Sequence, residues 1–309
     1  MNVAAIDLGT NSVRLLVTDA SGCALERRAD ITRLGAGLPA TGRLSAAGCD
    51  ATVALLRQHR RLLDRHVVTA LRVVATAAAR RASDASSFLE RAADAIGAPI
   101  EILSGDDEGR LSFAGATADL APADGPFLVV DVGGGSTELV VGTTRPAVGA
   151  ADGVEAAMSI DLGCVTLTEA ELHHDPPLPE ELANAVGAAA DALADAWRLA
   201  PALRQAATLV GVGGTITTLA AVELGLSVYD RDRVHGLLLE RAMVEDAFRA
   251  LATEALVDRV HNPGLPRDRA DVIVAGLCIV VALMRNLPAA EMRVSDADLL
   301  DALAASLRP

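Results

Sequence analysis

Two aspartates in this sequence stand in the same local setting, each after an apolar run and before a turn of small residues. Asp7 follows Val3-Ala4-Ala5-Ile6 and precedes Gly9-Thr10-Asn11-Ser12, whereas Asp131 follows Leu128-Val129-Val130 and precedes Gly133-Gly134-Gly135-Ser136. A carboxylate at a strand end can hold a hydrated Mg²⁺, and small residues let backbone N–H groups close around phosphate oxygens. Two such hairpins facing each other would form a phosphate clamp. The alternative is that both aspartates only cap their turns.

The elements that must position these turns can be read from the surrounding pattern. Residues 3–8 and 13–19 predict a β-hairpin, and Ser45 predicts the N-cap of a helix that ends near His66. Further along the first half we expect a buried strand at 71–75, a helix at 84–96, a short strand at 100–103 and a helix at 111–117.

The second half repeats the order of strand, glycine turn, strand and helix. We expect a return strand at 137–149, helices at 180–197 and 237–256, and a buried helix from Arg269. A third glycine turn, at residues 211–218, opens into a helix-like segment. Strands alternating with helices indicate an α/β protein with mixed sheets in both halves. The Pro- and Gly-rich break at 121–126 places the expected boundary between a first domain, 1–123, and a second, 124–295.

Composition narrows the class of protein. The chain has 309 residues, is 51% apolar and carries a net charge of −14, which argues against a nucleic-acid coat protein. No signal peptide or membrane-spanning run is recognisable, so we expect a cytoplasmic protein without membrane or nucleic-acid partners. The four cysteines lack metal-ligand spacing. Every basic residue is arginine, which excludes a P-loop lysine and a Schiff-base lysine.

Arginines are concentrated between residues 57 and 91. Arg57, Arg60, Arg61 and Arg65 share one face of the expected helix that begins after Ser45. The simpler interpretation is a solvated helix face, and the alternative is a track for a polyanion.

Four motifs together resemble the exopolyphosphatase and guanosine pentaphosphate phosphohydrolase (Ppx/GppA) family over nearly the whole chain. They are Ala5-Ile6-Asp7-Leu8-Gly9-Thr10-Asn11-Ser12-Val13-Arg14-Leu15-Leu16, then Ala75-Thr76 followed by Arg80, then Ile102-Leu103-Ser104-Gly105-Asp106-Asp107-Glu108-Gly109-Arg110-Leu111, and Asp131-Val132-Gly133-Gly134-Gly135-Ser136-Thr137-Glu138. The resemblance implies two ribonuclease-H-like domains of the actin, sugar-kinase and Hsp70 superfamily, with the active site in an inter-domain cleft. It also implies that a C-terminal helix, at about 296–309, packs on the first domain.

The resemblance assigns roles residue by residue. Asp7, Asp131 and Glu138 would hold Mg²⁺ or the attacking water, Glu108 would be the catalytic base, and Arg80 would neutralise phosphate oxygens. Without the resemblance, Glu108 could equally be a carboxylate stabilised by a helix N-terminus. Arg14 and Arg110 are expected to form intramolecular ion pairs. The residues expected to bind phosphate are Thr10, Asn11, Ser12, Gly133, Gly134, Gly135 and Ser136.

The activity implied is that of a phosphoric anhydride hydrolase, an exopolyphosphatase that releases terminal orthophosphate from inorganic polyphosphate with Mg²⁺. Other divalent cations and stimulation by a monovalent ion are compatible with this family, and a homodimer is its expectation. Because longer relatives append helical domains after the position of Pro309, we expect a preference for short chains. The alternatives are guanosine pentaphosphate hydrolysis, a kinase of the same fold and a non-catalytic nucleotide-binding regulator.

Three features are left open by the sequence. His235 is either structural or lines a substrate channel, and the third glycine turn either binds a nucleotide or belongs to the second-domain fold. The segment Val294–Leu303 departs from the family by carrying Ala297, Leu300 and Ala302 where relatives usually have glycine, arginine and glycine.

Overall fold

The computed structural model describes residues 1–144 and 153–308, which divide into two compact units. Unit 1 comprises Met1–Leu111 and Leu299–Pro309, and unit 2 comprises Ser112–Asp298. This division falls inside helix α5 (Gly105–Ala116) rather than at the expected position between residues 123 and 124, and the C-terminal segment groups with unit 1.

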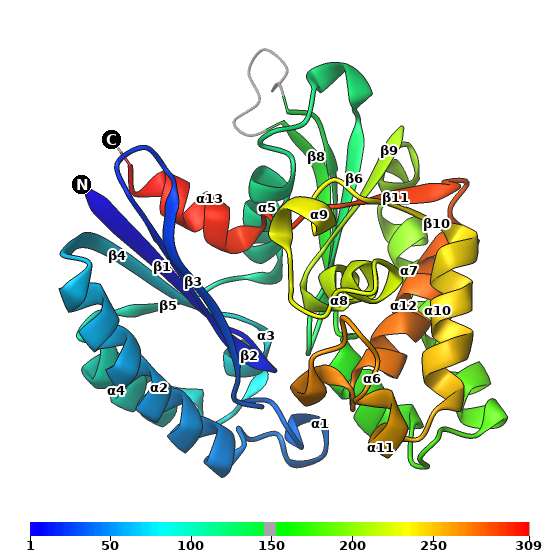
Figure 1. The fold of residues 1–309 in the computed structure, drawn as a ribbon, viewed down its shortest axis with the longest axis horizontal. Helices are drawn as coiled ribbons and strands as arrows, with labels where there is room; N and C mark the ends of the chain where they lie inside the picture. Colours follow the sequence, from blue (N-terminus) through cyan, green and yellow to red (C-terminus); the bar gives the residue numbers. More distant parts are fainter. Residues whose placement is uncertain (145–152, 309) are drawn as a thin grey trace. The chain divides into compact units, whose positions relative to one another are not determined.

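The sheet of unit 1 has five strands in the order β3-β2-β1-β4-β5 (Figure 1). Strands β1, β2 and β3 are antiparallel neighbours, whereas β4 is parallel to β1 and β5 is parallel to β4. The strands span Asn2–Leu8 (β1), Ser12–Thr18 (β2), Ala24–Ile31 (β3), Val68–Ala75 (β4) and Ile100–Ile102 (β5).

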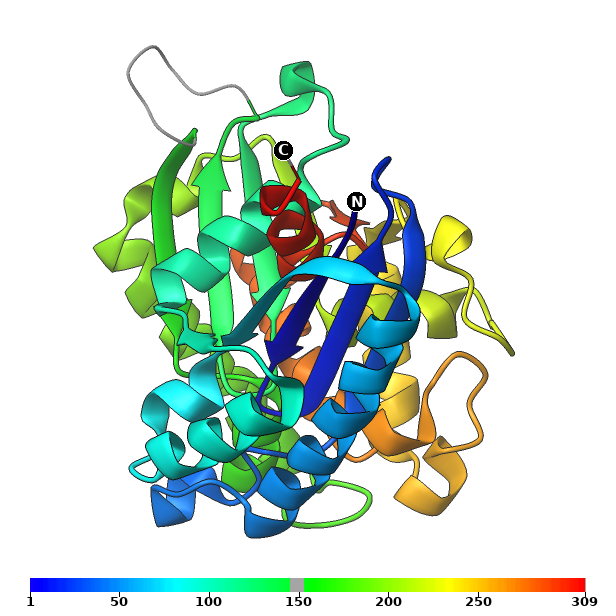
Figure 2. The same cartoon turned by 90° about the vertical axis from the view of Figure 1, so that its left-hand side faces the viewer.

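Side chains of β1 alternate between two apolar layers, as the two-residue period of a strand requires. Ala4, Ile6 and Leu8 pack in the layer that contains α2 (Ala46–Arg65) and α4 (Ala85–Ile96). Val3 and Ala5 pack in the layer that contains α13 (Leu299–Ser306). Figure 2 shows α2 and α4 side by side on one face of this sheet. The short helices α1 (Leu38–Thr41) and α3 (Ala77–Arg81) complete the unit.

The sheet of unit 2 repeats this arrangement. Its order is β10-β11-β9-β6-β7-β8, in which β6, β7 and β8 are antiparallel neighbours and β9 and β11 continue in parallel from β6. Both sheets therefore have the ribonuclease-H-like order that the family resemblance implied, with β10 added at one edge of the second. The strands span Phe127–Val132 (β6), Thr137–Gly142 (β7), Val154–Ile160 (β8), Thr208–Val212 (β9), Leu238–Glu240 (β10) and Glu291–Val294 (β11).

Helices cover the second sheet on both faces. Leu128, Val130 and Val132 of β6 pack in the large core with α7 and with α12, which is buried over residues 273–284. Phe127 and Val129 pack with the second half of α5. The helices are α6 (Cys164–Glu171), α7 (Pro179–Leu199), α8 (Gly214–Glu223), α9 (Arg231–Val234), α10 (Arg241–Thr253), α11 (Leu256–Arg259) and α12 (Ile273–Asn286), with 3₁₀ turns at Pro122–Asp124, Pro201–Arg204 and Arg267–Arg269.

Local signals located most elements of unit 1. The hairpin is confirmed, and Ser45 caps α2 by accepting a hydrogen bond from the Gly48 N–H at 3.1 Å. The helix expected at 111–117 begins earlier, at Gly105, because the Ser104 hydroxyl accepts from the Asp107 N–H at 3.1 Å and caps it.

Two expectations in unit 2 need correction. The single helix expected at 237–256 is wrong, because Leu238–Glu240 pairs with β11 and α10 starts only at Arg241. The return strand expected at 137–149 ends at Gly142, and the part of it from residue 145 lies outside the described residues. Among the described residues, no helix combines the length and apolarity needed to cross a membrane.

Candidate functional site

The first turn joins β1 to β2 in unit 1. The Gly9 N–H donates to the Ser12 carbonyl at 2.9 Å, and a β-carbon at Gly9 would lie 3.0 Å from that same oxygen, so the turn is tight. Asp7 is buried and lies directly opposite Arg14 in the sheet register. The Arg14 guanidinium donates to Asp7 Oδ2 through Nη2 at 2.8 Å and Nε at 3.0 Å. The expected ion pair of Arg14 is therefore confirmed, with Asp7 as its partner.

The second turn joins β6 to β7 in unit 2 and has the same geometry. The Gly133 N–H donates to the Ser136 carbonyl at 3.0 Å, and a β-carbon at Gly133 would again lie 3.0 Å from that oxygen. Asp131 lies directly opposite Glu138 in the register, so the two carboxylates are on the same face of the sheet.

The strand pairing of the two hairpins makes their turns equivalent position by position, and the residues at equivalent positions differ in charge at one place. Asp7 corresponds to Asp131, but Arg14 of the first hairpin corresponds to Glu138 of the second. In unit 1 an arginine compensates the aspartate, whereas in unit 2 a second carboxylate stands in the arginine's place. The two half-sites therefore differ in charge although their backbones agree.

Neighbouring segments hold the carbonyl groups of both turns. In unit 1, the Gly35 N–H donates to the Thr10 carbonyl at 2.8 Å, and the Thr32 and Arg33 N–H groups donate to the Asn11 carbonyl at 3.0 and 2.9 Å. Because C=O and N–H of a trans peptide point in opposite directions, the N–H groups of Asn11 and Ser12 face away from this segment. They point to the side where an anion could be bound.

The first turn of α6 plays the same part in unit 2. The Cys164 N–H donates to the Gly133 carbonyl and the Val165 N–H to the Gly134 carbonyl, both at 2.9 Å. A β-carbon at Gly163 would lie 2.4 Å from the Gly134 carbonyl carbon, so glycine is required for this approach. The N–H groups of Gly134 and Gly135 consequently face away from α6. Such successive N–H groups form a concave anion-binding arrangement.

The third glycine turn closes on Asp131, a contact that sequence reasoning missed. Gly213, between β9 and α8, has φ 89° and ψ 168°, and a β-carbon there would lie 2.6 Å from Asp131 Oδ1. The Ser112 hydroxyl donates to the other carboxylate oxygen, Oδ2, at 2.7 Å. Asp131 is thus fixed between α5 and the β9–α8 turn.

Arg269 is a second residue at this turn that the sequence did not single out as functional. A β-carbon at Gly214 would lie 1.7 Å from Arg269 Nη1, so the guanidinium rests on the glycine backbone where α8 begins. Arg269 also acts on the Cys164 thiol, whose pKa is raised by burial and lowered in smaller measure by this charge. A positive charge therefore lies at the start of α8, on the residue that follows Gly213.

Glu108 and Arg80 form one ion pair within unit 1. Arg80 Nη1 lies 3.0 Å from Glu108 Oε2 and also donates to the Leu103 carbonyl at 2.9 Å. The Glu108 side chain is 12% exposed and the Arg80 side chain 24%, so both are partly shielded from water. Glu108 stands in the first turn of α5, next to Asp107, whose carboxylate accepts from the Ser104 hydroxyl. Asp107 is therefore engaged in capping, and Glu108 is directed to the arginine.

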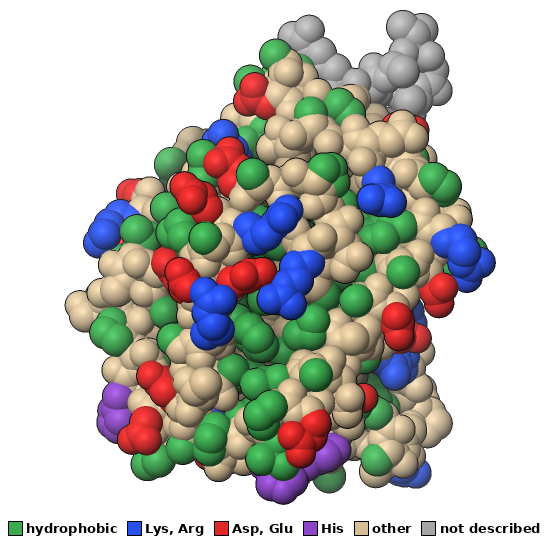
Figure 3. Space-filling model, turned by 90° about the vertical axis from the view of Figure 1, so that its right-hand side faces the viewer, with side chains coloured by type: hydrophobic (Ala, Val, Ile, Leu, Met, Phe, Trp, Pro, Cys, Tyr) green, Lys and Arg blue, Asp and Glu red, His purple; other side chains and the backbone are tan. Residues whose placement is uncertain are grey.

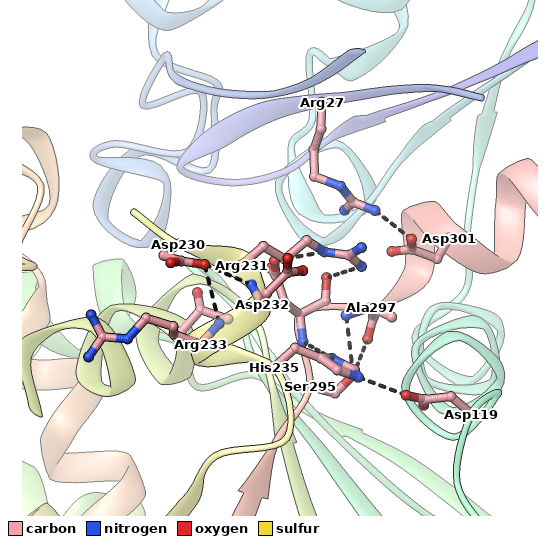
Figure 4. A network of polar contacts seen from close by, with 12 residues as sticks. Arg27, Asp119, Asp230, Arg231, Asp232, Arg233, His235, Ser295, Ala297 and Asp301 are labelled. Carbon is pink, nitrogen blue, oxygen red and sulfur yellow. Dashed lines mark hydrogen bonds and ion pairs between the residues drawn. The ribbon is translucent and has the colours of Figure 1, made fainter. Parts of the chain in front are cut away.

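His235 connects two segments of unit 2 (Figure 4). Its Nδ1 accepts from the Asp296 N–H at 3.1 Å, so the proton of the neutral ring is on Nε2, which donates to Asp119 Oδ2 at 2.7 Å. The Asp296 carboxylate accepts from Arg231 Nε at 3.0 Å. Burial and the neighbouring Asp296 raise the pKa of Tyr229, which therefore stays a neutral phenol. These contacts give His235 a structural role and hold the segment after β11.

The carboxylates of unit 2 suit a divalent cation with few protein ligands. Asp131 is 8% exposed and Glu138 is 2% exposed, and the Ser159 hydroxyl donates to Glu138 Oε1 at 2.7 Å. Among the residues that the structure describes, no group of three or more His, Cys, Asp or Glu side chains could hold a metal. Mg²⁺ often takes only one or two carboxylates and completes its shell with water and phosphate oxygens, so this pair fits it.

Comparisons with known proteins agree with this architecture. A sequence model of the Ppx/GppA phosphatase family matches residues 17–304. Exopolyphosphatase 2 of Mycobacterium tuberculosis is 38% identical over 321 aligned residues, which cover 99% of this chain and 98% of that protein. The crystal structure of the Aquifex aeolicus member of the Ppx/GppA family superposes with a TM-score of 0.80 at 32% identity, covering 99% and 97% of the two chains. An exopolyphosphatase from Cytophaga hutchinsonii has the same fold, with a TM-score of 0.88 at 22% identity over 99% and 97% of the two chains.

Proposed function

The chain belongs to the Ppx/GppA phosphatase family, and from this we propose that it hydrolyses inorganic polyphosphate from the chain end, releasing one orthophosphate in each turnover. The observation that carries the choice of substrate is the 38% identity to Exopolyphosphatase 2 over 99% of the chain. The duplicated turns support the chemistry, since each offers backbone N–H groups on one side and a buried aspartate at the strand end.

In this proposal the turns bind the terminal phosphates. The N–H groups of residues 11–12 and 134–135 donate to phosphate oxygens, while Ser12 and Ser136 add hydroxyl groups. The α6 N-terminus and the 32–35 segment hold the turn carbonyls, so the N–H groups are oriented before substrate arrives. Binding then costs little rearrangement of the backbone.

Asp131 and Glu138 are the residues that hold Mg²⁺ in this proposal. When bound, the ion neutralises phosphate charge and draws electron density from the phosphorus under attack. Asp7 is the third expected ligand, but its Oδ2 already accepts two hydrogen bonds from Arg14. We therefore assign the larger share of cation binding to the Asp131–Glu138 pair.

Glu108 acts as the general base and Arg80 keeps it ionised. Water attacks the terminal phosphorus, its proton passes to the Glu108 carboxylate, and the bridging P–O bond breaks, leaving a chain shorter by one phosphate. The guanidinium of Arg80, 3.0 Å from Glu108 Oε2, favours the charged carboxylate that accepts this proton. Arg80 can also donate to a phosphate oxygen as charge builds in the transition state.

Orthophosphate release from length-defined polyphosphate, guanosine pentaphosphate and ATP tests the proposal. We expect Mg²⁺-dependent release from polyphosphate, lowered about a hundredfold or more in Glu108→Gln, the scale of a general-base contribution. Asp106→Asn is the matched control, because Asp106 is an exposed carboxylate in the same helical turn. Asp131→Asn should abolish the same reaction, because Asp131 is one of the two residues assigned to the bound Mg²⁺.

Three outcomes would contradict the proposal. Release from guanosine pentaphosphate alone would assign the chain to the alarmone branch of the family. Transfer from ATP only when an acceptor is supplied would make it a kinase. Full activity of Glu108→Gln would show that Glu108 is not the general base.

A further inference from the structure

Three arginines on α2 form an exposed stripe whose guanidinium groups have no polar partner among the described residues. Arg57, Arg61 and Arg65 are spaced by four residues and all three are exposed. Within residues 1–144 and 153–308, the structure has no hydrogen bond or ion pair to any of these guanidinium groups. Four residues of α-helix rise about 6 Å, so the charges follow one another at short, regular intervals. We refer to these three residues as the arginine stripe.

The stripe is not compensated by the acidic residues of its own helix. Asp64 pairs with Arg60 at 2.5 Å, and Asp50 pairs with Arg91 of α4 at 2.6 Å. Like charges four residues apart repel and weaken a helix. A chain with a net charge of −14 thus carries a row of unpaired positive charges that costs helix stability. That cost suggests a ligand of opposite charge.

The helix that bears the stripe begins beside the 33–35 segment, which holds the carbonyl groups of the unit 1 turn. The Ser45 N–H donates to the Leu34 carbonyl at 2.9 Å, and a β-carbon at Gly48 would lie 2.6 Å from the Arg33 carbonyl oxygen. The next residue, Gly35, donates its N–H to the Thr10 carbonyl. Counted from the start of α2, the three arginines follow at about 17, 23 and 29 Å along the helix axis.

We propose that the arginine stripe is an accessory binding surface for the distal part of a long inorganic polyphosphate chain. This inference rests on the proposed function, in which the chain end is held at the turns. A short chain occupies the turns alone, whereas a long chain also extends along α2. The stripe thus adds affinity for long chains without taking part in the hydrolysis of the terminal phosphate.

An inorganic polyanion fits the stripe better than a single-stranded nucleic acid. Proteins that bind single strands combine basic grooves with aromatic side chains on which the bases stack. Helix α2 has no aromatic residue other than His59, which is completely buried. A row of guanidinium groups without stacking surfaces matches a polymer that carries charge but no bases.

Several exposed arginines of unit 2 are ion-paired instead. On the face drawn in Figure 3, basic and acidic side chains lie next to one another. Arg285 of α12 and Arg249 of α10 both contact Glu245, and Arg198 of α7 contacts Asp195. These three arginines are exposed and ion-paired, and they provide a control with the same change in net charge.

The test compares two triple variants for binding to polyphosphate chains of several hundred units and to tripolyphosphate, across a salt series. The stripe variant carries Arg57→Gln, Arg61→Gln and Arg65→Gln. We expect its affinity for long chains to fall about tenfold or more, and the slope of log affinity against log salt to become shallower by about 2, as for three lost contacts to a single-stranded polyanion. Affinity for tripolyphosphate stays unchanged. The control variant carries Arg198→Gln, Arg249→Gln and Arg285→Gln and should match the parent on both ligands.

Catalysis gives a second readout. The stripe variant should show a raised KM on long chains with an unchanged kcat, and thermal unfolding no lower than that of the parent, since a repulsive row has been removed. Should the triple variant fail to fold, Arg61→Gln alone must lower the salt slope by about 0.7.

Several results would overturn the inference. If both triple variants lost the same affinity for long polyphosphate chains, the effect would come from net charge alone and not from the arginine stripe. If the stripe variant kept the affinity of the parent, the stripe would not bind polyphosphate. If single-stranded RNA bound to the arginine stripe as tightly as polyphosphate does, the inference that the stripe binds inorganic polyphosphate would be wrong. Stripe-dependent polyphosphate binding without any hydrolysis would refute the proposed function alone, whereas Glu108-dependent hydrolysis with no effect of the stripe would refute this inference alone.

Discussion

Replacing Gly213 by alanine tests whether the third glycine turn supports Asp131. With φ 89° and ψ 168°, Gly213 lies in a region that is essentially restricted to glycine, and a side chain held there costs about 1–3 kcal/mol. The added β-carbon would also lie 2.6 Å from Asp131 Oδ1 and 3.1 Å from the Val132 carbonyl oxygen. One of the two must move, and the Ser112 hydroxyl bonded to Oδ2 restrains the carboxylate.

We expect Gly213→Ala to lower both the free energy of unfolding and kcat. The unfolding free energy should fall by about 1–3 kcal/mol in urea titrations. A carboxylate displaced by about 1 Å can cost on the order of a hundredfold in rate, so orthophosphate release should fall by a factor of that order at saturating substrate. KM should change less, because the turn N–H groups belong to the β6–β7 turn.

Gly225→Ala is the matched control for backbone strain. Gly225 has φ 60° in the same unit, and a β-carbon there would meet nothing within 4 Å. It should cost about 1–2 kcal/mol for the left-handed conformation and leave kcat unchanged. If Gly213→Ala matched Gly225→Ala in both unfolding free energy and kcat, the argument that the glycine turn positions Asp131 would be refuted.

Three further predictions follow from single contacts. Glu138→Gln should raise the Mg²⁺ concentration needed for half-maximal phosphate release, whereas Glu155→Gln on the adjoining strand should not. Identical Mg²⁺ titrations of the two variants would exclude Glu138 from cation binding. Gly163→Ala would place a β-carbon 2.4 Å from the Gly134 carbonyl carbon and so push α6 away from the turn. Because the turn N–H groups are assigned to phosphate binding, KM for polyphosphate should rise. An unchanged KM in steady-state kinetics would show that α6 does not shape the turn. Burial lowers the pKa of His59 below the ordinary histidine value near 6.5, so the unfolded chain takes up the proton first and the free energy of unfolding falls as the pH drops below that value. Urea titrations from pH 5 to 8 should show this fall in the parent protein and not in His59→Leu. Parallel curves of unfolding free energy against pH for the two proteins would contradict the prediction.

The sequence predicted those features that depend on neighbours along the chain. Ser45 caps α2, Gly97 ends α4 in a left-handed conformation, and the β1–β2 hairpin spans the residues expected of it. Each of these depends on side chains within a few residues, where hydrogen bonding and backbone strain follow simple rules. The sequence also predicted an ion pair of Arg14 without naming its partner, and the hairpin register makes that partner Asp7.

Contacts between distant segments could not be predicted in the same way. Gly213 reaches Asp131 because β9 pairs in parallel with β6, and Arg269 reaches Gly214 from a 3₁₀ turn that precedes α12. The local pattern predicts a helix at strand β10, because the three residues of this strand are defined by pairing with β11 and not by their own pattern. The proton position on His235 likewise depends on an N–H of Asp296 that only the folded chain supplies.

The exchange of Arg14 for Glu138 at one register position means that the two halves of a repeated fold draw their counter-charge from different sources. The first half supplies its own cation from the polypeptide, so its electrostatics are set once the chain has folded. The second half presents two neighbouring carboxylates at this register position, and in the proposed function a divalent cation from solution binds them. Supply of divalent ions would then control one half of the repeat while leaving the other intact. The two halves of the repeated fold would then differ in their need for a divalent cation, although their backbone turns agree.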